Sequence, residues 1–330
     1  MLRIGLTGGI AAGKSVVAER FGRLGAVVVD GDLLARAAVE PGSDGLGDVV
    51  AAFGREFLGP DGGLDRPALG RLVFADSSAR ERLNAIIHPR VRAAAAHLIG
   101  QTPEGAVVVE DMPLLVETGQ AARFNLVVVV DAPHEVRISR MVDRRGMERR
   151  DAEQRIAVQA SREERLNAAD AILVNDRGLD DLVAAADALW RERIEPFRDN
   201  LRSGRPVLAR ASSSTWAGLA GTSALSRRIQ AKLEAVLPAG VSVYPAGSSG
   251  GRSDDDDVDV DDDDVRRTVV RVSPARAGEV PAASDVIAEA GFPRVADADD
   301  HGPAEDSTVH RGADPAVDVT VLVAAGDPSA

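Results

Sequence analysis

A glycine-rich segment near the N-terminus has the residue types and spacing of a phosphate-binding loop. Gly8 and Gly13 are followed by Lys14 and Ser15, which completes the pattern G-x-x-x-x-G-K-[ST]. Glycines let such a loop curl until its backbone N–H groups point at phosphate oxygens, and the lysine brings a compact positive charge to them. The serine hydroxyl is a ligand for Mg²⁺. The segment therefore predicts that the chain binds ATP together with Mg²⁺.

The lysine of this motif differs from the basic residues in the rest of the chain. Lys14 and Lys232 are the only lysines among the 330 residues, and all other basic side chains except the histidines are arginines. A compact ammonium group suits contact with the β- and γ-phosphates. We therefore expect position 14 to require lysine for chemical reasons.

Two aspartates follow the second predicted strand and could act on an acceptor. Asp30-Gly31-Asp32 comes directly after the apolar run 26–29. Carboxylates at the C-terminal end of a parallel strand lie at the mouth of the sheet, where ligands bind. Asp32 could there accept the proton of an acceptor hydroxyl or hold Mg²⁺ through water. The alternative is turn chemistry, in which Asp32 caps a helix over 33–39.

Arginines crowd the stretch 137–155. Arg137, Arg140 and Arg144 recur at spacings of three and four residues, which places them on one helical face. Such cations can close over phosphates, stabilise charge on a transferring group and exclude water. For most of these arginines a solvated face paired with nearby acidic residues is the simpler interpretation. Arg140 and Arg144, which lead into Gly146, are the candidates for a functional role.

The elements that must position these residues alternate between buried strands and helices over residues 1–200. Continuous apolar runs predict strands buried on both faces, and segments of helical spacing lie between them. The alternation predicts an α/β domain with a P-loop NTPase-type parallel sheet and helical substrate and lid regions. The predicted strands are 2–6, 26–29, 107–109, 126–130 and 171–174, and the predicted helices are 14–24, 79–98 with an interruption at His88-Pro89, 135–144, 151–167 and 179–191.

The composition changes near residue 200, and a smaller α+β region is expected to follow. Residues 201–216 are predicted to be a linker and 217–236 one amphipathic helix. The run 254–264 holds nine Asp in eleven residues without EF-hand spacing, so its default interpretation is a solvated acidic loop. Later strand and helix signals, at 268–272, 284–290 and 317–323, are weak. We therefore expect poor order across much of 240–330.

The overall composition excludes several classes of protein. A net charge of −13 argues against nucleic acid as a partner, because neutralising phosphates requires clustered cations. The absence of cysteine excludes disulfides and thiolate metal sites. Neither a signal peptide nor an apolar run of ~20 residues is recognisable. We expect a cytoplasmic, monomeric protein with no membrane partner.

Several segments together resemble the dephospho-CoA kinase family. The resemblance covers residues 1–200 in order and includes the phosphate loop, the second-strand aspartates, a central helix with His-Pro, a substrate-side segment and the start of a lid. These segments are 4–15, 28–36, 82–89, 113–117 and 140–147, with Gln159, 169–170 and 174–176 as further landmarks.

The resemblance implies ATP-dependent phosphorylation of the ribose 3′-hydroxyl of dephospho-CoA, with Mg²⁺. It implies that Lys14 contacts the transferring group, that Asp32 activates the hydroxyl and that Arg140 stabilises the transition state. The acceptor would contact Asp32, His88, Leu114 and Leu115. The nucleotide would be bound by Gly8, Ala11, Ala12, Gly13, Lys14, Ser15, Val16, Arg144 and Asn175, with Ser15 also on Mg²⁺. Ala11 departs from the family pattern, which has glycine there; Val16 and Gly31 depart from it as well.

The C-terminal part resembles a degenerate GrpB-like domain, a nucleotidyltransferase-like module that actinobacterial members of the family carry. Residues 205–208 with Trp216 are similar to its opening, and Tyr244-Pro245-Ala246-Gly247-Ser248-Ser249 stands where it has His-Ile-Gly-Ser-Thr. Val258-Asp259-Val260 lies near its strand aspartates. Because the histidine is missing, we expect a non-catalytic version over 217–330.

Reasoning from the residues leaves other functions open. A nucleoside or nucleotide kinase of the same fold would share the motifs, and so would a non-catalytic P-loop nucleotide-binding or switch protein. The chain has no guanine-selecting Asn-Lys-x-Asp. A further alternative places the function in 201–330, with the aspartate run as a two-metal site.

Overall fold

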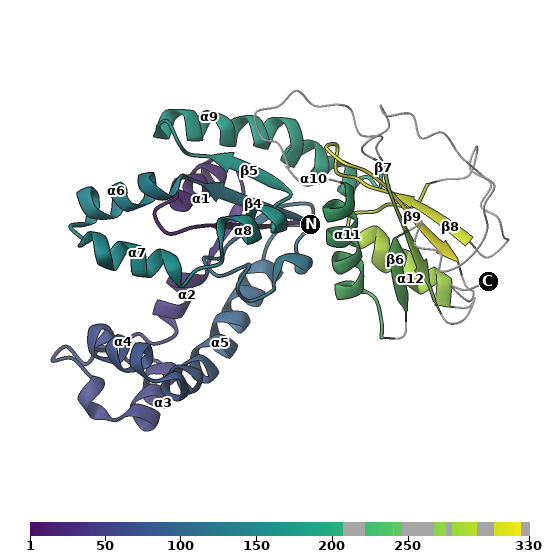
Figure 1. Ribbon diagram of the computed structural model, residues 1–330. Helices are drawn as coiled ribbons and strands as arrows, with labels where there is room; N and C mark the ends of the chain where they lie inside the picture. Colours follow the sequence, from purple (N-terminus) through teal and green to yellow (C-terminus); the bar gives the residue numbers. More distant parts are fainter. Residues whose placement is uncertain (207–221, 240, 246–266, 275–278, 296–306, 325–330) are drawn as a thin grey trace, which may run out of the picture. The chain divides into compact units, whose positions relative to one another are not determined.

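The structure is a computed structural model that describes residues 1–206, 222–239, 241–245, 267–274, 279–295 and 307–324 (Figure 1). The chain forms two compact units, one of residues 1–27, 104–109 and 113–330 and the other of 28–103 and 110–112. The aspartate run, Trp216 and most of the predicted linker lie outside the described residues.

A five-stranded sheet carries the phosphate loop, and it confirms the predicted α/β fold. The strand order is β2-β3-β1-β4-β5, and β1 pairs in parallel with β4, as β4 does with β5. Each strand overlaps a predicted apolar run, and every residue of β4 is buried, as expected for a strand covered on both faces. The strands are β1 (Leu2–Gly8), β2 (Val27–Asp30), β3 (Val107–Asp111), β4 (Leu126–Asp131) and β5 (Ala171–Val174).

The helices of the first unit follow the predicted pattern with one correction. Residues 151–167 do not form one helix, because the chain breaks at 158–161. The Ser161 hydroxyl accepts the Glu164 N–H, and the Glu164 carboxylate accepts the Ser161 N–H, so a capping box starts a new helix there. The helices are α1 (Lys14–Arg23), α6 (His134–Arg145), α7 (Arg149–Ala157), α8 (Arg162–Ala168), α9 (Leu179–Leu189), the π-turn Trp190–Ile194 and α10 (Glu195–Arg202).

The second unit is helical and has its own small core. Its longest helix, α5, runs unbroken through Pro89, so the interruption expected there is wrong. A proline removes one helical hydrogen bond, and the packing of Leu83, Ile86 and Ile87 against the core outweighs that loss. The helices are α2 (Gly31–Ala37), α3 (Asp44–Phe53), α4 (Arg66–Ala75) and α5 (Ser77–Gly100), with a 3₁₀ turn at Arg55–Phe57.

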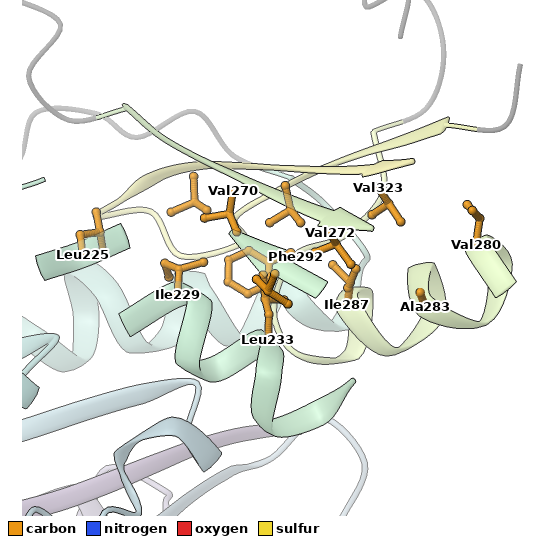
Figure 2. Packing of buried hydrophobic residues seen from close by; sticks show 13 residues of the cluster. Leu225, Ile229, Leu233, Val270, Val272, Val280, Ala283, Ile287, Phe292 and Val323 are labelled. Carbon is orange, nitrogen blue, oxygen red and sulfur yellow. The ribbon is translucent and has the colours of Figure 1, made fainter. Parts of the chain in front are cut away.

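The C-terminal residues form a second sheet of four strands in the order β6-β7-β9-β8. β7 and β9 are parallel, whereas β6–β7 and β8–β9 are antiparallel. Val270 and Val272 of β7, with alternate residues of β9, point at helices α11 and α12 and form a buried core (Figure 2). The elements are α11 (Thr222–Val236), β6 (Ser242–Pro245), β7 (Arg267–Ser273), α12 (Val280–Glu289), β8 (Ser307–Arg311) and β9 (Asp318–Ala324).

The expectation of poor order across much of 240–330 stays a prediction, because the structure describes only part of that range. The weak signals at 268–272, 284–290 and 317–323 fall within or across β7, α12 and β9. The predicted helix 217–236 corresponds to α11 over its described residues. None of the described helices is both long and apolar enough to cross a membrane.

Buried ion pairs link α11 and the segment after β8 to the rest of the first unit. Lys232 and Arg228 of α11 contact the carboxylate of Asp170, at 2.8 and 3.1 Å. Arg193 contacts Asp314 at 2.7 Å, and its side chain is 2% exposed. Because unpaired charges are costly inside a protein, these pairs make the C-terminal helices and strands part of the packing around β5.

Candidate active site

The phosphate loop joins β1 to α1, as its motif predicts. Gly8 ends β1, Lys14 is the first residue of α1, and Gly13 between them has φ 107°, in the left-handed region. A Cβ at Gly13 would lie 2.4 Å from Nδ2 of Asn175, and one at Gly8 would lie 2.6 Å from the carbonyl oxygen of Val130. Only glycine fits at these two positions, because a side chain would collide with its neighbours.

Three successive carbonyl groups of the loop are held by side chains outside it. Arg137 Nε donates to the Ile10 carbonyl at 2.9 Å, and Arg140 Nη1 donates to that of Ala11 at 3.3 Å. The Ala12 carbonyl accepts Nδ2 of Asn175 at 2.7 Å. Within a trans peptide unit the N–H points opposite to the C=O, so these contacts direct the N–H groups of Ala11 and Gly13 away from the three side chains, while the Ala12 N–H donates to the Gly9 carbonyl at 3.0 Å. Backbone N–H groups that line a loop bind phosphate.

Ala11 adopts a conformation that L-residues rarely take. Its φ is 60°, and it is the only non-glycine residue with positive φ among those the structure describes. A left-handed alanine costs on the order of 1–2 kcal/mol, and a glycine would avoid that cost. The sequence departure at this position is therefore a source of strain in the loop.

Arg140 and Asn175 are hydrogen-bonded to each other as well as to the loop. Arg140 Nη2 donates to the side-chain oxygen of Asn175 at 2.9 Å and to its backbone carbonyl at 3.2 Å. Asn175 is 1% exposed, and its own N–H donates to the Asp131 carbonyl at the end of β4. In this structure both side chains therefore support the loop from behind.

Buried cations make this region attractive to an anion. Burial, and then repulsion by Arg165, lower the pKa of Arg137 to about 10, while Asp131 opposes the shift. Burial, and then the nearby Arg144, lower the pKa of Arg140. Arg137 stays charged at neutral pH with such a pKa, so the loop is backed by positive charge.

A pocket of about 540 Å³ adjoins the loop through Arg140. Pockets of this size hold nucleoside-sized ligands. Arg144, predicted to bind the nucleotide, lines it as well. The pocket is bounded by Glu135, Val136, Ser139, Arg140, Asp143 and Arg144 of α6 and by Asp176 and Arg177 after β5.

Ser15 and Val16 occupy the first turn of α1. The Ser15 side chain is exposed, and Val16 donates its N–H to the Gly13 carbonyl at 3.0 Å. Within the described ranges no group of three or more His, Asp or Glu side chains could hold a metal ion. Mg²⁺ in kinases keeps several waters and binds substrate phosphates, so a single protein hydroxyl beside the loop fits it.

The acceptor-side aspartates belong to the second unit. Asp30 caps α2, because its Oδ1 accepts the N–H groups of Asp32 at 2.8 Å and Leu33 at 3.0 Å. The alternative in which Asp32 is the cap is therefore wrong. The Asp32 carboxylate is exposed, and it makes no hydrogen bond to any residue that the structure describes. It is thus available for a ligand.

The other predicted acceptor contacts differ in exposure. His88 is exposed on α5, and Leu114 is 51% exposed. Leu115 is fully buried, and its Cδ1 would lie 2.6 Å from a Cβ at Gly5. Leu115 is therefore a core residue that packs on β1, and Leu114 is the member of the pair that can meet a ligand.

Sequence reasoning missed two residues of this site. Arg137 was assigned to a solvated face but is 4% exposed and contacts the loop. Gln159, considered only as a family landmark, accepts the Ile10 N–H at 2.9 Å. The helical spacing of Arg137 with Arg140 and Arg144 was a usable signal, since all three must lie on one face. No local pattern marked Gln159.

The comparisons with known proteins agree with this geometry. The family model described as dephospho-CoA kinase matches residues 2–181. A dephospho-CoA kinase of Mycolicibacterium paratuberculosis is 54% identical over 201 residues, which cover 61% of this chain and 49% of that protein. One of Streptomyces avermitilis is 48% identical over 194 residues, 59% of this chain and 95% of that protein.

A solved structure is similar as well. A crystal structure from Thermus thermophilus is 35% identical, covers 58% of this chain and 97% of that one, and superposes with a TM-score of 0.51. The matched part spans about half, 49%, of the length of the mycobacterial relative. A match of the family model to more than half of the residues assigns the chain: it belongs to the dephospho-CoA kinase family.

Proposed function

We propose that this protein transfers the γ-phosphoryl group of ATP to the ribose 3′-hydroxyl of dephospho-CoA, the final step of coenzyme A biosynthesis. The observation that carries the proposal is the phosphate loop, whose carbonyls at Ile10, Ala11 and Ala12 are bound from behind in a chain of this family. A loop fixed in this way supplies positioning and electrostatic stabilisation, which phosphoryl transfer chiefly needs.

On the nucleotide side, the loop N–H groups and Lys14 bind the β- and γ-phosphates. Lys14 starts α1, so the positive end of the helix dipole adds to its charge. The pocket beside Arg140 and Arg144 takes the nucleoside part of ATP, which places the phosphates on the loop. Its polar lining suits a ribose and a base.

On the acceptor side, Asp32 accepts the proton of the 3′-hydroxyl as the oxygen attacks. Its carboxylate is exposed and bonds to none of the residues that the structure describes, which supports this role, because Asp30 already caps the helix. Arg140 stabilises the charge that develops on the transferring group, and its guanidinium already lies against the loop. His88 and Leu114 are the proposed further contacts of the acceptor.

Ser15 is the proposed protein ligand of Mg²⁺, since its exposed hydroxyl directly follows Lys14 in the first turn of α1. When bound there, Mg²⁺ would supply positive charge that offsets the charge of the phosphates. The hydroxyl is a hard oxygen donor, which is the type that Mg²⁺ prefers.

We also infer that residues 217–330 are a degenerate, non-catalytic GrpB-like domain, and that the protein works as a cytoplasmic monomer. A mixed four-stranded sheet with two helices supports an α+β domain. Tyr244 and Pro245 end β6 where the related domain has its histidine segment, so the histidine of that segment is missing.

The test is incubation of the protein with ATP, Mg²⁺ and dephospho-CoA, followed by the mass of the product. We expect coenzyme A, one phosphoryl group heavier than the acceptor, and no coenzyme A from a Lys14→Ala variant that melts at the same temperature. Arg at position 14 should fail as well, because its planar fork does not replace a compact ammonium. Phosphorylation of a nucleoside monophosphate in place of dephospho-CoA would overturn the acceptor assignment.

A further inference from the structure

One side-chain oxygen joins the phosphate loop to the connection between α7 and α8. Oε1 of Gln159 accepts the backbone N–H of Ile10 at 2.9 Å and Nη2 of Arg137 at 2.9 Å. Gln159 follows the last turn of α7, Arg137 lies on α6 and Ile10 lies in the loop. Three segments that are distant in the sequence therefore meet at a single acceptor atom.

Ile10, Gln159 and Arg137 form a closed ring of hydrogen bonds. Arg137 Nε donates to the Ile10 carbonyl at 2.9 Å, while Gln159 accepts the Ile10 N–H, so both backbone polar groups of this residue are bound. The Arg137 guanidinium also lies against the loop backbone, because a Cβ at Gly9 would be 2.5 Å from its Cζ. Ile10 can change its orientation only if this ring opens.

The connection that carries Gln159 is itself anchored. The next residue, Ala160, donates its N–H to Oε1 of Glu117 at 2.8 Å, and its carbonyl accepts Nη1 of Arg165. The capping box of Ser161 follows directly. The backbone next to Gln159 is therefore held by hydrogen bonds. A residue can position another group only if its own backbone is held in this way.

Helix α7 contacts α6 through the ion pair of Arg149 with Glu135, but the two side chains are 58% and 68% exposed, and such pairs contribute little. Gly146, with φ 60°, ends α6 just before α7 begins. At its other end α7 leads into Gln159, which ties the connection to the loop at Ile10.

We propose that Gln159 is a positioning residue that, with Arg137, sets the conformation of the phosphate loop at Ile10 and couples nucleotide binding to the α7–α8 connection. Without the acceptor, the Ile10 N–H and Arg137 Nη2 each lose a hydrogen-bond partner at this site. The Ile10 peptide then loses its fixed orientation, and the N–H groups that follow it no longer converge on phosphate. The inference rests on the proposed use of ATP.

The test compares Gln159→Met, which keeps the shape but removes the acceptor, with Gln159→Glu, which keeps an acceptor next to Arg137. Affinity for a non-hydrolysable ATP analogue with Mg²⁺ is measured by calorimetry, and KM is measured for both substrates. We expect Gln159→Met to weaken analogue binding and to raise the KM for ATP about tenfold. The KM for dephospho-CoA should stay within about twofold of wild type, and Gln159→Glu should bind the analogue more tightly than Gln159→Met.

Gln154→Met is the matched control, because Gln154 is exposed on α7 and makes no hydrogen bond within the part of the chain that the structure describes. It should bind the analogue as wild type does. The proposal is overturned if Gln159→Met binds like wild type, if Gln159→Glu is as weak as Gln159→Met, or if the control is weakened equally. Binding of the analogue does not require phosphoryl transfer, so a wild-type protein that binds it but forms no coenzyme A contradicts the proposed function alone.

Discussion

The ammonium group of Lys232 lies 2.8 Å from a carboxylate oxygen of Asp170, and both side chains are less than 10% exposed. The same carboxylate accepts the N–H of Val127 at 2.8 Å and pairs with Arg228. Burial alone would raise the pKa of Asp170, but Lys232, Arg228 and Arg193 lower it to about 2. The carboxylate is therefore ionised at every pH at which the protein is handled.

Removal of one partner of this buried pair should be costly. Lys232→Met leaves the Asp170 charge with fewer partners, and we expect the free energy of unfolding at pH 7 to fall by about 3 kcal/mol in urea denaturation. Arg23→Met is the control, because its pair with Glu19 is 68% and 65% exposed. The control should change stability by less than about 1 kcal/mol. Equal decreases in the free energy of unfolding of the two variants would show that the buried pair stabilises the protein no more than the exposed pair does.

Acidification should destabilise the C-terminal sheet through His310. This side chain is fully buried, with Nε2 bonded to the Ser284 hydroxyl at 2.8 Å and Nδ1 to the Phe292 carbonyl at 2.7 Å. Burial lowers its pKa below 6.5, the Phe292 carbonyl opposes the shift, Arg294 adds to it and Asp285 opposes it. Because the unfolded chain takes up the proton first, stability is complete above about pH 6.5 and falls as the pH drops below it.

The measurement is the melting temperature between pH 7.5 and pH 5. It should fall on acidification in wild type and fall less in His310→Asn, which does not titrate. His97→Asn, at a histidine exposed on α5, should follow the wild-type curve. A His310→Asn curve parallel to wild type would contradict the assignment.

The strained alanine of the phosphate loop predicts an unusual response to glycine. Ala11→Gly relieves a positive φ, so we expect it to leave the free energy of unfolding unchanged or to raise it by up to about 1 kcal/mol. Ala12→Gly, at a buried neighbour without positive φ, should lower it by about 1 kcal/mol. The free energy of unfolding of both variants is measured by urea denaturation. Equal decreases in the two variants would show that Ala11 is not strained.

The two aspartates after β2 should respond differently to the same change. Asp32→Asn removes the proposed base, and we expect kcat to fall at least about a hundredfold, with affinity for the ATP analogue retained. Asp30→Asn should keep most activity, because asparagine caps helices as well as aspartate does. A larger loss of kcat in Asp30→Asn than in Asp32→Asn would contradict this assignment and make Asp30 the base.

Local patterns predicted the parts of the site that depend on local geometry. The strand, glycine turn and helix around Gly13 and Lys14 follow from neighbouring residues, and so do the buried strands of the parallel sheet. Which of Asp30 and Asp32 caps α2 was not predictable, because either carboxylate can cap a helix that starts nearby. The break before Ser161 was readable from its capping box with Glu164, a local signal that the helical spacing of 151–167 obscured.

Long-range contacts account for what sequence reasoning could not reach. β7 pairs with β9, so Arg267 stands opposite Asp318 in the sheet although α12 and β8 separate the two strands in the sequence. The contact of Gln159 with Ile10 spans 149 residues. Such contacts depend on how the fold brings segments together and leave no periodic trace in either segment.

The carbonyls of Ile10, Ala11 and Ala12 are bound by side chains of the protein itself. The conformational entropy of these peptide groups is therefore lost when the chain folds, and it is not lost again at each encounter with a ligand. Nucleotide can then arrive at, and leave, a surface that does not rearrange. For the proposed phosphoryl transfer, in which one nucleotide leaves before the next binds, such rigidity favours rapid exchange.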